Sequence, residues 1–344
     1  FINGPVVKDF AQHLSEYMGG CHVTTCANGT DALQIALMAL ELKPGDEVIV
    51  PAFTYVASAE VIGLLGLTPV MVDVDYDTFN VTVENIKKAL SPKTKAIIPV
   101  HLFGQSCDME PVLYFAKEHN LYVIEDNAQA IGAEYTFSDG HKAKTGTMGT
   151  IGCTSFFPSK NLGCYGDGGA VFTDDDEIDA RLRSLRAQGK SPVDKYDNRE
   201  IGMNSRLDTL QAAVLLPKFK AFVAYELDAV NDVAKWYTER LSKRFETPVV
   251  PEGFYSSWAQ YTIMLESKKQ RDRLQVRLKE KGIPTMIYYP RGLHQQYAYH
   301  WMNLRDEDFP NTTLSTQRVL SLPIHPYLKN EEQNYIIEEL LEAL

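Results

Sequence analysis

Positive charge is scarce in this sequence of 344 residues, which has 34 Lys and Arg against 45 Asp and Glu and a formal net charge of -11. An acidic surface repels nucleic acid and anionic lipid. Nucleic-acid and membrane partners are therefore disfavoured. Any anionic ligand must be held by a local cluster of donors.

Cysteine is scarce as well, and the five cysteines form no Cys-x-x-Cys pair. A chain of this size does not need disulfides, so we expect reduced thiols in a cytoplasmic protein. The histidines are scattered, and no group of residues has the spacing of zinc ligands, so we expect no metal. The longest apolar stretch, residues 61–72, is too short to span a bilayer. No secretion signal is visible, and the first residue is Phe1, so we expect that a leading segment is missing from this sequence.

The order of apolar and amphipathic segments predicts an α/β fold. Short apolar runs without strict alternation are typical of strands that are buried on both faces. Such runs occupy residues 48–50, 70–72, 96–98, 121–124 and 170–172, and helical patterns separate them at 31–40, 55–65, 82–90 and 109–118. The alternation predicts a layered domain with a mainly parallel central sheet.

The pattern changes near residue 206, which suggests a second domain. Helical patterns cover residues 207–222 and 227–245, and Pro217 is expected to kink or break the first of them. Strands are predicted at 260–265 and 285–289, with helices at 270–281 and 331–344. We therefore predict a large domain over residues 1–215. Linking helices and a smaller α+β C-terminal domain would occupy residues 216–344.

Lys160 is the residue that indicates an enzymatic reaction most directly. It ends the segment Ser155-Phe156-Phe157-Pro158-Ser159-Lys160, which follows a strand-like run and precedes a glycine-rich stretch, residues 161–169. A lysine in an apolar, glycine-flanked turn has its charged form disfavoured and can serve as a nucleophile. Such an amine can hold the aldehyde of pyridoxal phosphate (PLP). On this context alone, a loop lysine with its stem on apolar surface remains the alternative.

Asp126 ends the apolar run 121–124 and is expected at the carboxyl edge of a strand, where α/β sheets bind ligands. Its carboxylate there can pair with a pyridinium nitrogen, although a plain helix cap is an equally common use of such a residue. Gln129, three residues later, can reach a ring hydroxyl. Tyr55 can stack on a ring, or simply belong to the core. His101 follows a buried strand and is interpreted as a hydrogen-bonded structural histidine.

Gly29 and Thr30 precede an amphipathic helix and could receive a phosphate. The start of a helix offers unpaired N–H groups and the positive end of a dipole, and glycine allows close approach. Ser155 adds a hydroxyl. A helix cap without a ligand is the alternative. The glycines of 163–169 lack the order of a dinucleotide loop and predict a tight turn.

Together these residues resemble the fold type I PLP-dependent transferases, and among them the DegT-type nucleotide-sugar aminotransferases. The resemblance extends over nearly the whole chain. Its most specific motifs are residues 155–160 with 166–169, and Asn204-Ser205-Arg206-Leu207-Asp208. Residues 153–160 and 162–169 resemble in particular the UDP-2-acetamido-2-deoxy-3-oxo-glucuronate aminotransferases of bacterial surface-polysaccharide synthesis.

The resemblance implies roles for the cofactor residues. Lys160 would hold PLP covalently, Asp126 would meet the pyridine nitrogen, Gln129 would meet the ring hydroxyl and Tyr55 would stack on the ring. The phosphate would be held by Gly29, Thr30 and Ser155. Asn204 would reach that phosphate from the neighbouring subunit, which implies a homodimer with shared active sites.

The resemblance also implies a reaction. Glutamate would donate an amino group to a 3-oxo UDP-sugar, with Arg206 binding a substrate anion and Tyr288 and Tyr289 lining the sugar pocket. The relatives often carry a histidine where this chain has Tyr288, which cannot carry positive charge. Two alternatives are an aminotransferase for a dTDP- or GDP-linked keto sugar and a PLP-binding regulator without turnover. A sugar dehydratase of the same fold is disfavoured, because such enzymes replace the lysine with histidine.

Overall fold

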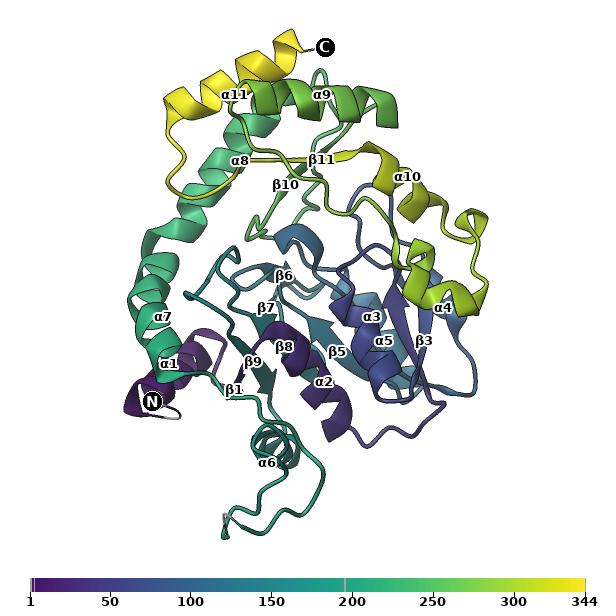
Figure 1. Ribbon diagram of the computed structural model, residues 1–344, viewed down its shortest axis with the longest axis vertical. Coiled ribbons are helices and arrows are strands. Elements are labelled where there is room, and N and C mark those ends of the chain that lie inside the picture. The colour runs from purple at the N-terminus through teal and green to yellow at the C-terminus, as the bar shows by residue number, and fades with distance from the viewer. Residues whose placement is uncertain (1, 3, 195, 344) are drawn as a thin grey trace.

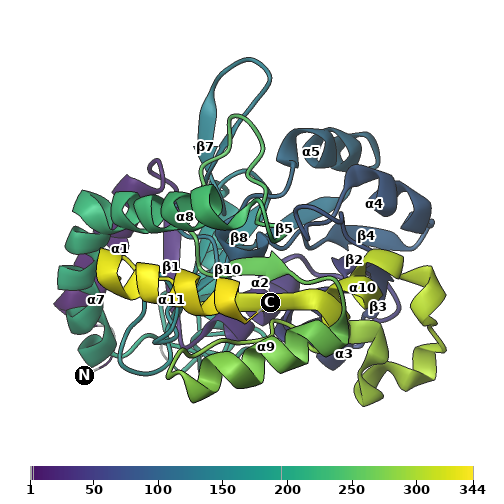
Figure 2. The same ribbon diagram turned by 90° about the horizontal axis from the view of Figure 1, so that it is seen from above.

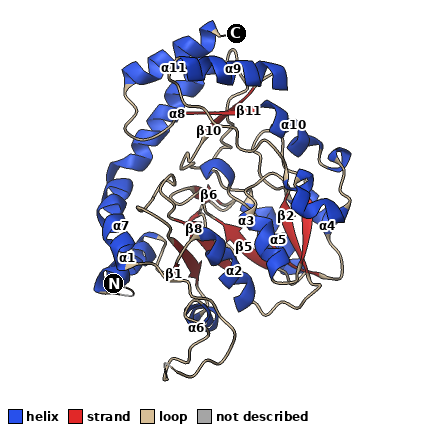
Figure 3. Ribbon diagram, in the orientation of Figure 1, coloured by secondary structure: helices blue, strands red, loops and turns tan. Residues whose placement is uncertain are grey.

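The computed structural model describes residues 2, 4–194 and 196–343. Its centre is a seven-stranded sheet with the order β1-β9-β8-β5-β4-β2-β3 (Figure 3). The strands are β1 (His22–Cys26), β2 (Glu47–Pro51), β3 (Thr68–Val72), β4 (Thr94–Ile97), β5 (Tyr122–Asp126), β8 (Ile151–Ser155) and β9 (Gly169–Thr173). Only β9 runs antiparallel to its neighbours, so the predicted mainly parallel α/β sheet is confirmed.

The helices that follow the strands pack against this sheet. They are α2 (Gly29–Ala39), α3 (Ala57–Leu64), α4 (Val83–Ala89), α5 (Met109–Glu118) and α6 (Asp176–Leu185), and α1 (Pro5–Tyr17) precedes the first strand. Four of them overlap the predicted helices, whereas α1, α6 and β1 were not predicted. The α1 helix buries Val7, Phe10 and Leu14 on one face. A short hairpin of β6 (Glu134–Thr136) and β7 (Lys142–Lys144) extends from the sheet.

A long helical arm connects the sheet to the C-terminal unit (Figure 1). It consists of α7 (Thr209–Ala221), a π-helical turn (Phe222–Glu226) and α8 (Leu227–Leu241). Pro217 lies inside α7, and the helix continues past it, so the predicted break is wrong. The irregularity comes five residues later, at the π-turn, a feature that is frequent at functional sites.

The C-terminal unit has a two-stranded antiparallel sheet of β10 (Tyr261–Met264) and β11 (Val319–Leu322). Its helices are α9 (Lys268–Glu280), α10 (Pro310–Arg318) and α11 (Asn330–Glu342). Seen from above, α9 and α11 lie side by side over the sheet (Figure 2). Together with α8 they enclose a separate apolar core. The boundary predicted between residues 215 and 216 stays a prediction.

The strand predicted at residues 285–289 is wrong. Only Met286 pairs with the small sheet, through an isolated bridge to Ser321. The chain then leaves the sheet and carries Tyr289 to the large domain, where its hydroxyl accepts a hydrogen bond from Gln129. The strand that completes the small sheet is β11, which the sequence pattern did not reveal.

Phe10 provides a test of how α1 supports the fold. Its ring is fully buried and makes edge-to-face contacts with Phe156, at 5.4 Å between centroids, and with Phe219, at 6.2 Å. We expect Phe10→Ala to lower the free energy of unfolding by about 3–5 kcal/mol in urea denaturation, because it leaves a cavity. The control, Tyr114→Ala on a side chain that is 67% exposed, should stay within about 0.5 kcal/mol of wild type. Equal losses in the two variants would contradict this packing.

Candidate active site

The carboxyl ends of two neighbouring parallel strands bring the first site residues together. The strands β5 and β8 pair in register from Ile124 with Ile151 to Asp126 with Cys153. Asp126 is 5% exposed. One of its oxygens accepts a hydrogen bond from Ser58 Oγ at 2.7 Å, and the other accepts one from the N–H of Ala128 at 3.1 Å. The carboxylate is therefore fixed by α3 and by the turn after β5.

Gln129 joins this strand edge to the C-terminal half of the chain. Its side-chain oxygen accepts a hydrogen bond from the N–H of Phe103 at 2.7 Å, and its amide nitrogen donates to Tyr289 Oη at 3.1 Å. Burial raises the pKa of Tyr289, which keeps the phenol neutral. The rings of Tyr289 and Tyr55 lie 6.4 Å apart, and Tyr55 is 56% exposed. Tyr55 therefore presents an open aromatic face beside Tyr289.

Lys160 lies in a turn that is fixed at both ends. Its N–H donates to the carbonyl of Phe157 at 2.8 Å, and the N–H of Phe156 donates to Gly168 at 2.7 Å. Asn161, the next residue, donates from its side chain to the carbonyl of Ser257. Burial lowers the pKa of Lys160, while the charge of Asp126 opposes this shift. The amine is thus closer to its neutral, nucleophilic form than a lysine in water.

The first turn of α2 forms a cradle with the end of β8. Asn28 caps the helix, accepting a hydrogen bond from the N–H of Asp31 at 2.8 Å. A Cβ atom on Gly29 would lie 2.7 Å from Ser155 Cβ, so only glycine leaves this space open. Thr30 is half-buried on the same turn. The N–H groups of the turn and the Ser155 hydroxyl provide donors suited to a phosphate.

His101 has a structural role, as predicted. The N–H of Cys107 donates to Nδ1 at 3.0 Å, so the proton is on Nε2, which donates to Glu125 at 2.8 Å. Both residues are fully buried. Glu125 also accepts from the N–H groups of Gly146, Met148 and Gly149 at 2.6 to 2.7 Å. With both ring nitrogens occupied, the imidazole cannot act as a base.

The segment with Asn204 and Arg206 lies beside the loop that leads into α2. Ser205 Oγ accepts a hydrogen bond from the N–H of Ala27 at 3.0 Å. Asn204 is exposed, and Arg206 and Tyr288 are half-buried. The structure contains one chain, so the reach of Asn204 into a neighbouring subunit stays a prediction.

A cavity of about 120 Å³ beside Lys160 contains residues that the sequence analysis missed. His325, Trp258 and Glu226 line it together with Lys160. Glu226 belongs to the π-turn and accepts a hydrogen bond from the Tyr327 hydroxyl. His325 Nδ1 accepts from the N–H of Tyr327 at 3.2 Å, which leaves Nε2–H as a donor. The sequence signal was a proline-flanked histidine directly after the apolar run 319–322.

Comparison with known proteins identifies the family. The model of the DegT/DnrJ/EryC1/StrS aminotransferase family matches residues 1–341. The chain belongs to this family.

Three similar proteins illustrate the range of the family. The UDP-2-acetamido-2-deoxy-3-oxo-D-glucuronate aminotransferase of Pseudomonas aeruginosa is 44% identical over 332 residues, which cover 95% of this chain and 88% of that protein. A pleiotropic regulatory protein of Geobacillus stearothermophilus is 42% identical, with coverage of 99% and 90%. The crystal structure of a family aminotransferase from Brucella abortus has a TM-score of 0.92 at 44% identity and covers 99% of this chain and 91% of that one.

The protein is therefore a PLP-dependent aminotransferase of fold type I. A solved relative from Streptococcus pneumoniae, 27% identical with a TM-score of 0.91, is described in its PLP form, and this chain aligns over its full length with 93% of that one. The residues of this chain fit the group. They offer a buried amine, a fixed carboxylate, an open aromatic face and a glycine-lined cradle, contributed by Lys160, Asp126, Tyr55 and Gly29.

In the described part of the chain, no helix has both the length and the apolar character needed to cross a bilayer. Within the same residues, no group of three or more His, Cys, Asp or Glu side chains is arranged to hold a metal ion. All five cysteines are buried and free.

Gly29 provides a test of the cradle. We expect Gly29→Ala to weaken PLP binding at least about tenfold, because the new methyl group fills the space next to Ser155. Equilibrium titration of the apoprotein with PLP measures the effect. The control is Gly63→Ala in α3, where a Cβ meets nothing within 4 Å. That variant should bind PLP like wild type, and equal affinity in the Gly29 variant would refute the cradle.

Proposed function

We propose that the enzyme moves an amino group from glutamate to a 3-oxo UDP-sugar, UDP-2-acetamido-2-deoxy-3-oxo-glucuronate or a close analogue. The observation that carries this proposal is the convergence of Lys160, Asp126 and the Gln129–Tyr289 pair at one sheet edge. The sugar is suggested by the 44% identity to the Pseudomonas aeruginosa enzyme. The product would serve bacterial surface-polysaccharide synthesis, including lipopolysaccharide, in the cytoplasm.

Each of the residues assigned to the cofactor has a separate chemical role. When bound, PLP supplies an electron sink for the substrate carbon. Lys160 attaches the cofactor and then carries a proton on Nζ to and from that carbon. Asp126, held by Ser58 and the Ala128 N–H, keeps the pyridine nitrogen protonated. Among the described residues, the side chain of Gln129 bonds only Phe103 and Tyr289, so its second amide N–H can be donated to the ring hydroxyl.

The remaining assigned residues bind phosphate, ring and substrate. Gly29, Thr30 and Ser155 hold the cofactor phosphate, and Tyr55 covers one face of the ring. Asn204 completes the phosphate site of a second subunit, so the working unit is a homodimer with two shared sites. Arg206 binds an anionic group of the nucleotide sugar, and Tyr288 and Tyr289 line the sugar pocket.

A regulator that binds PLP without turnover is the second candidate. The observation that favours it is the 42% identity to the pleiotropic regulatory protein of Geobacillus stearothermophilus over 99% of this chain. A regulator can keep the same cofactor residues, so they do not distinguish the two candidates.

Turnover separates the two candidates. Purified protein with PLP and glutamate should release 2-oxoglutarate and change the cofactor absorbance, because Lys160 can transfer the proton. Adding the 3-oxo UDP-sugar should restore the original absorbance and yield the amino sugar, detected by mass spectrometry. Keto sugars linked to dTDP or GDP test the alternative carriers. Lys160→Ala should lose turnover at least about 10³-fold. Binding of PLP without 2-oxoglutarate release would favour the regulator.

The pH dependence of PLP attachment tests the electrostatics of Lys160. Only the neutral amine attacks the aldehyde, and burial lowers the pKa of Lys160, so the attachment midpoint should lie below that of an exposed lysine, about 10.4. The charge of Asp126 raises this pKa, so Asp126→Asn should move the midpoint to still lower pH. Borohydride trapping at a series of pH values, followed by peptide mapping, measures the midpoint. Asp232→Asn, on the exposed face of α8, serves as the control. A higher midpoint in Asp126→Asn would contradict the assignment.

A further inference from the structure

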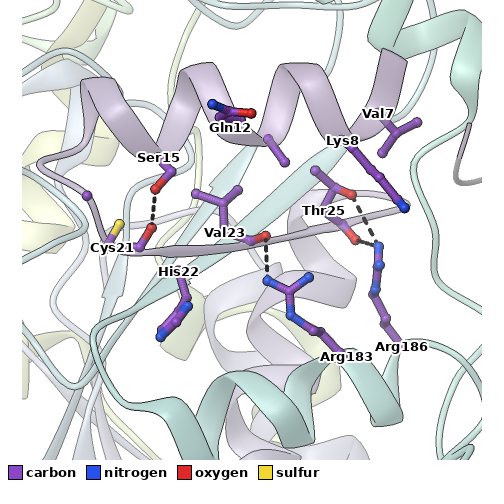
Figure 4. A pocket seen from close by; sticks show the side chains of 12 residues that line it. Val7, Lys8, Gln12, Ser15, Cys21, His22, Val23, Thr25, Arg183 and Arg186 are labelled. Carbon is purple, nitrogen blue, oxygen red and sulfur yellow. Dashed lines mark hydrogen bonds between the residues drawn. The ribbon is translucent and has the colours of Figure 1, made fainter. Parts of the chain in front are cut away.

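A second cavity, of about 420 Å³, lies outside the active site, between α1, β1 and α6 (Figure 4). None of the residues assigned to PLP or substrate lines it. Its volume is within the range of small-molecule sites, roughly 300–1,000 Å³. Figure 4 shows Lys8 descending from α1 while Arg183 and Arg186 rise from α6 toward the strand between them. Cationic side chains thus enter this cavity from two helices of an acidic chain.

The strand β1 is the edge of the large sheet, and the two arginines bind its outer carbonyls. Arg183 Nη2 donates to the carbonyl of Val23 at 3.5 Å. Arg186 Nη1 donates to the carbonyl of Thr25 and, at 3.2 Å, to its hydroxyl oxygen. Because the Thr25 oxygen accepts this bond, its own proton is free to be donated. Covering the strand edge therefore uses one guanidinium nitrogen of each arginine, Nη2 of Arg183 and Nη1 of Arg186, and not the others.

Not every basic side chain around the cavity has a carboxylate partner. Arg183 is paired with Asp179 at 2.7 Å, and His22 is paired with Asp176 at 2.7 Å. Among the described residues, Arg186 and Lys8 have no carboxylate within ion-pair distance. Within the same residues, the Nε of Arg186 is buried and has no hydrogen-bond acceptor, so the donors of this guanidinium are not all satisfied.

The environment of Arg186 is also positive. Burial lowers its pKa first, and the neighbouring charges of Arg183 and Arg206 lower it further, which opposes the effect of Asp179. Like charges held this close are stabilised by an anion between them. Arginine presents a planar fork that matches the oxygens of a phosphate, and lysine supplies a second point charge.

We propose that this cavity is a phosphate-binding site formed by Arg186, Lys8 and the Thr25 hydroxyl, separate from the PLP phosphate cradle. Its ligand is inorganic phosphate or the phosphate group of a small metabolite. The Nη edge of the Arg186 guanidinium contacts the phosphate oxygens, and Lys8, which is exposed and has no carboxylate partner among the described residues, closes the site from α1. A function restricted to covering the strand edge would not need Lys8.

Calorimetric titration of the PLP-loaded enzyme with inorganic phosphate, in a phosphate-free buffer of low ionic strength, tests the proposal. Saturating PLP removes the cofactor cradle as a second site. We expect one saturable phosphate per chain, with an affinity that falls as salt is added. Lys8→Gln should weaken binding about tenfold, and Arg186→Lys, which keeps the charge and loses the fork, should weaken it at least as much.

Controls separate this outcome from misfolding and from failure of the proposed function. Lys88→Gln, an exposed lysine on α4, should bind phosphate like wild type. Circular dichroism of each variant confirms the fold, and Lys8→Gln remains informative if Arg186→Lys does not fold. A parallel titration with glycerol phosphate distinguishes free phosphate from a phosphate ester. Absence of saturable binding in wild type, or equal affinity in Lys8→Gln, would refute the site whatever the result of the aminotransferase assay.

Discussion

The buried carboxylate of Glu125 is the interaction on which the rest of the site depends. It sits at the end of β5, where it accepts three backbone N–H groups of the 146–149 turn and the Nε2–H of His101. Side chains alternate across a strand, so fixing Glu125 on one face fixes Asp126 on the other. A buried charge is tolerated only when such donors surround it. The position of the Asp126 carboxylate, for which we propose a cofactor contact, thus depends on a neighbouring carboxylate on the other face of the strand.

Much of this organisation could be predicted from residue patterns. Apolar runs of three or four residues predicted five central strands, because a strand buried on both faces leaves a clear signal. The turn around Lys160 and the glycine at the start of α2 were predicted because each has a specific backbone requirement. The adjacency of β5 and β8 was not visible, since strand order is set by long-range pairing and not by local sequence.

The failures have physical causes as well. Residues 285–289 have the composition of a strand, but the contact of Tyr289 with Gln129 takes this segment out of the sheet. Pro217 was expected to kink or break a helix, and the arm instead continues past it and widens at residues 222–226. His325 and Trp258 were missed because only the folded chain brings their distant segments to Lys160. Roles that require a second subunit, such as the one proposed for Asn204, depend on contacts that a single chain does not contain.

The ties between the two halves of the polypeptide have a mechanical consequence. Gln129 holds Tyr289, and Asn161, the residue after Lys160, holds the carbonyl of Ser257, so two loops of the large domain are tied to residues that follow the helical arm. A tilt of the C-terminal unit would therefore be transmitted to both loops at the same time. The segment proposed to contact the cofactor ring and the segment proposed to carry the amine would then move together.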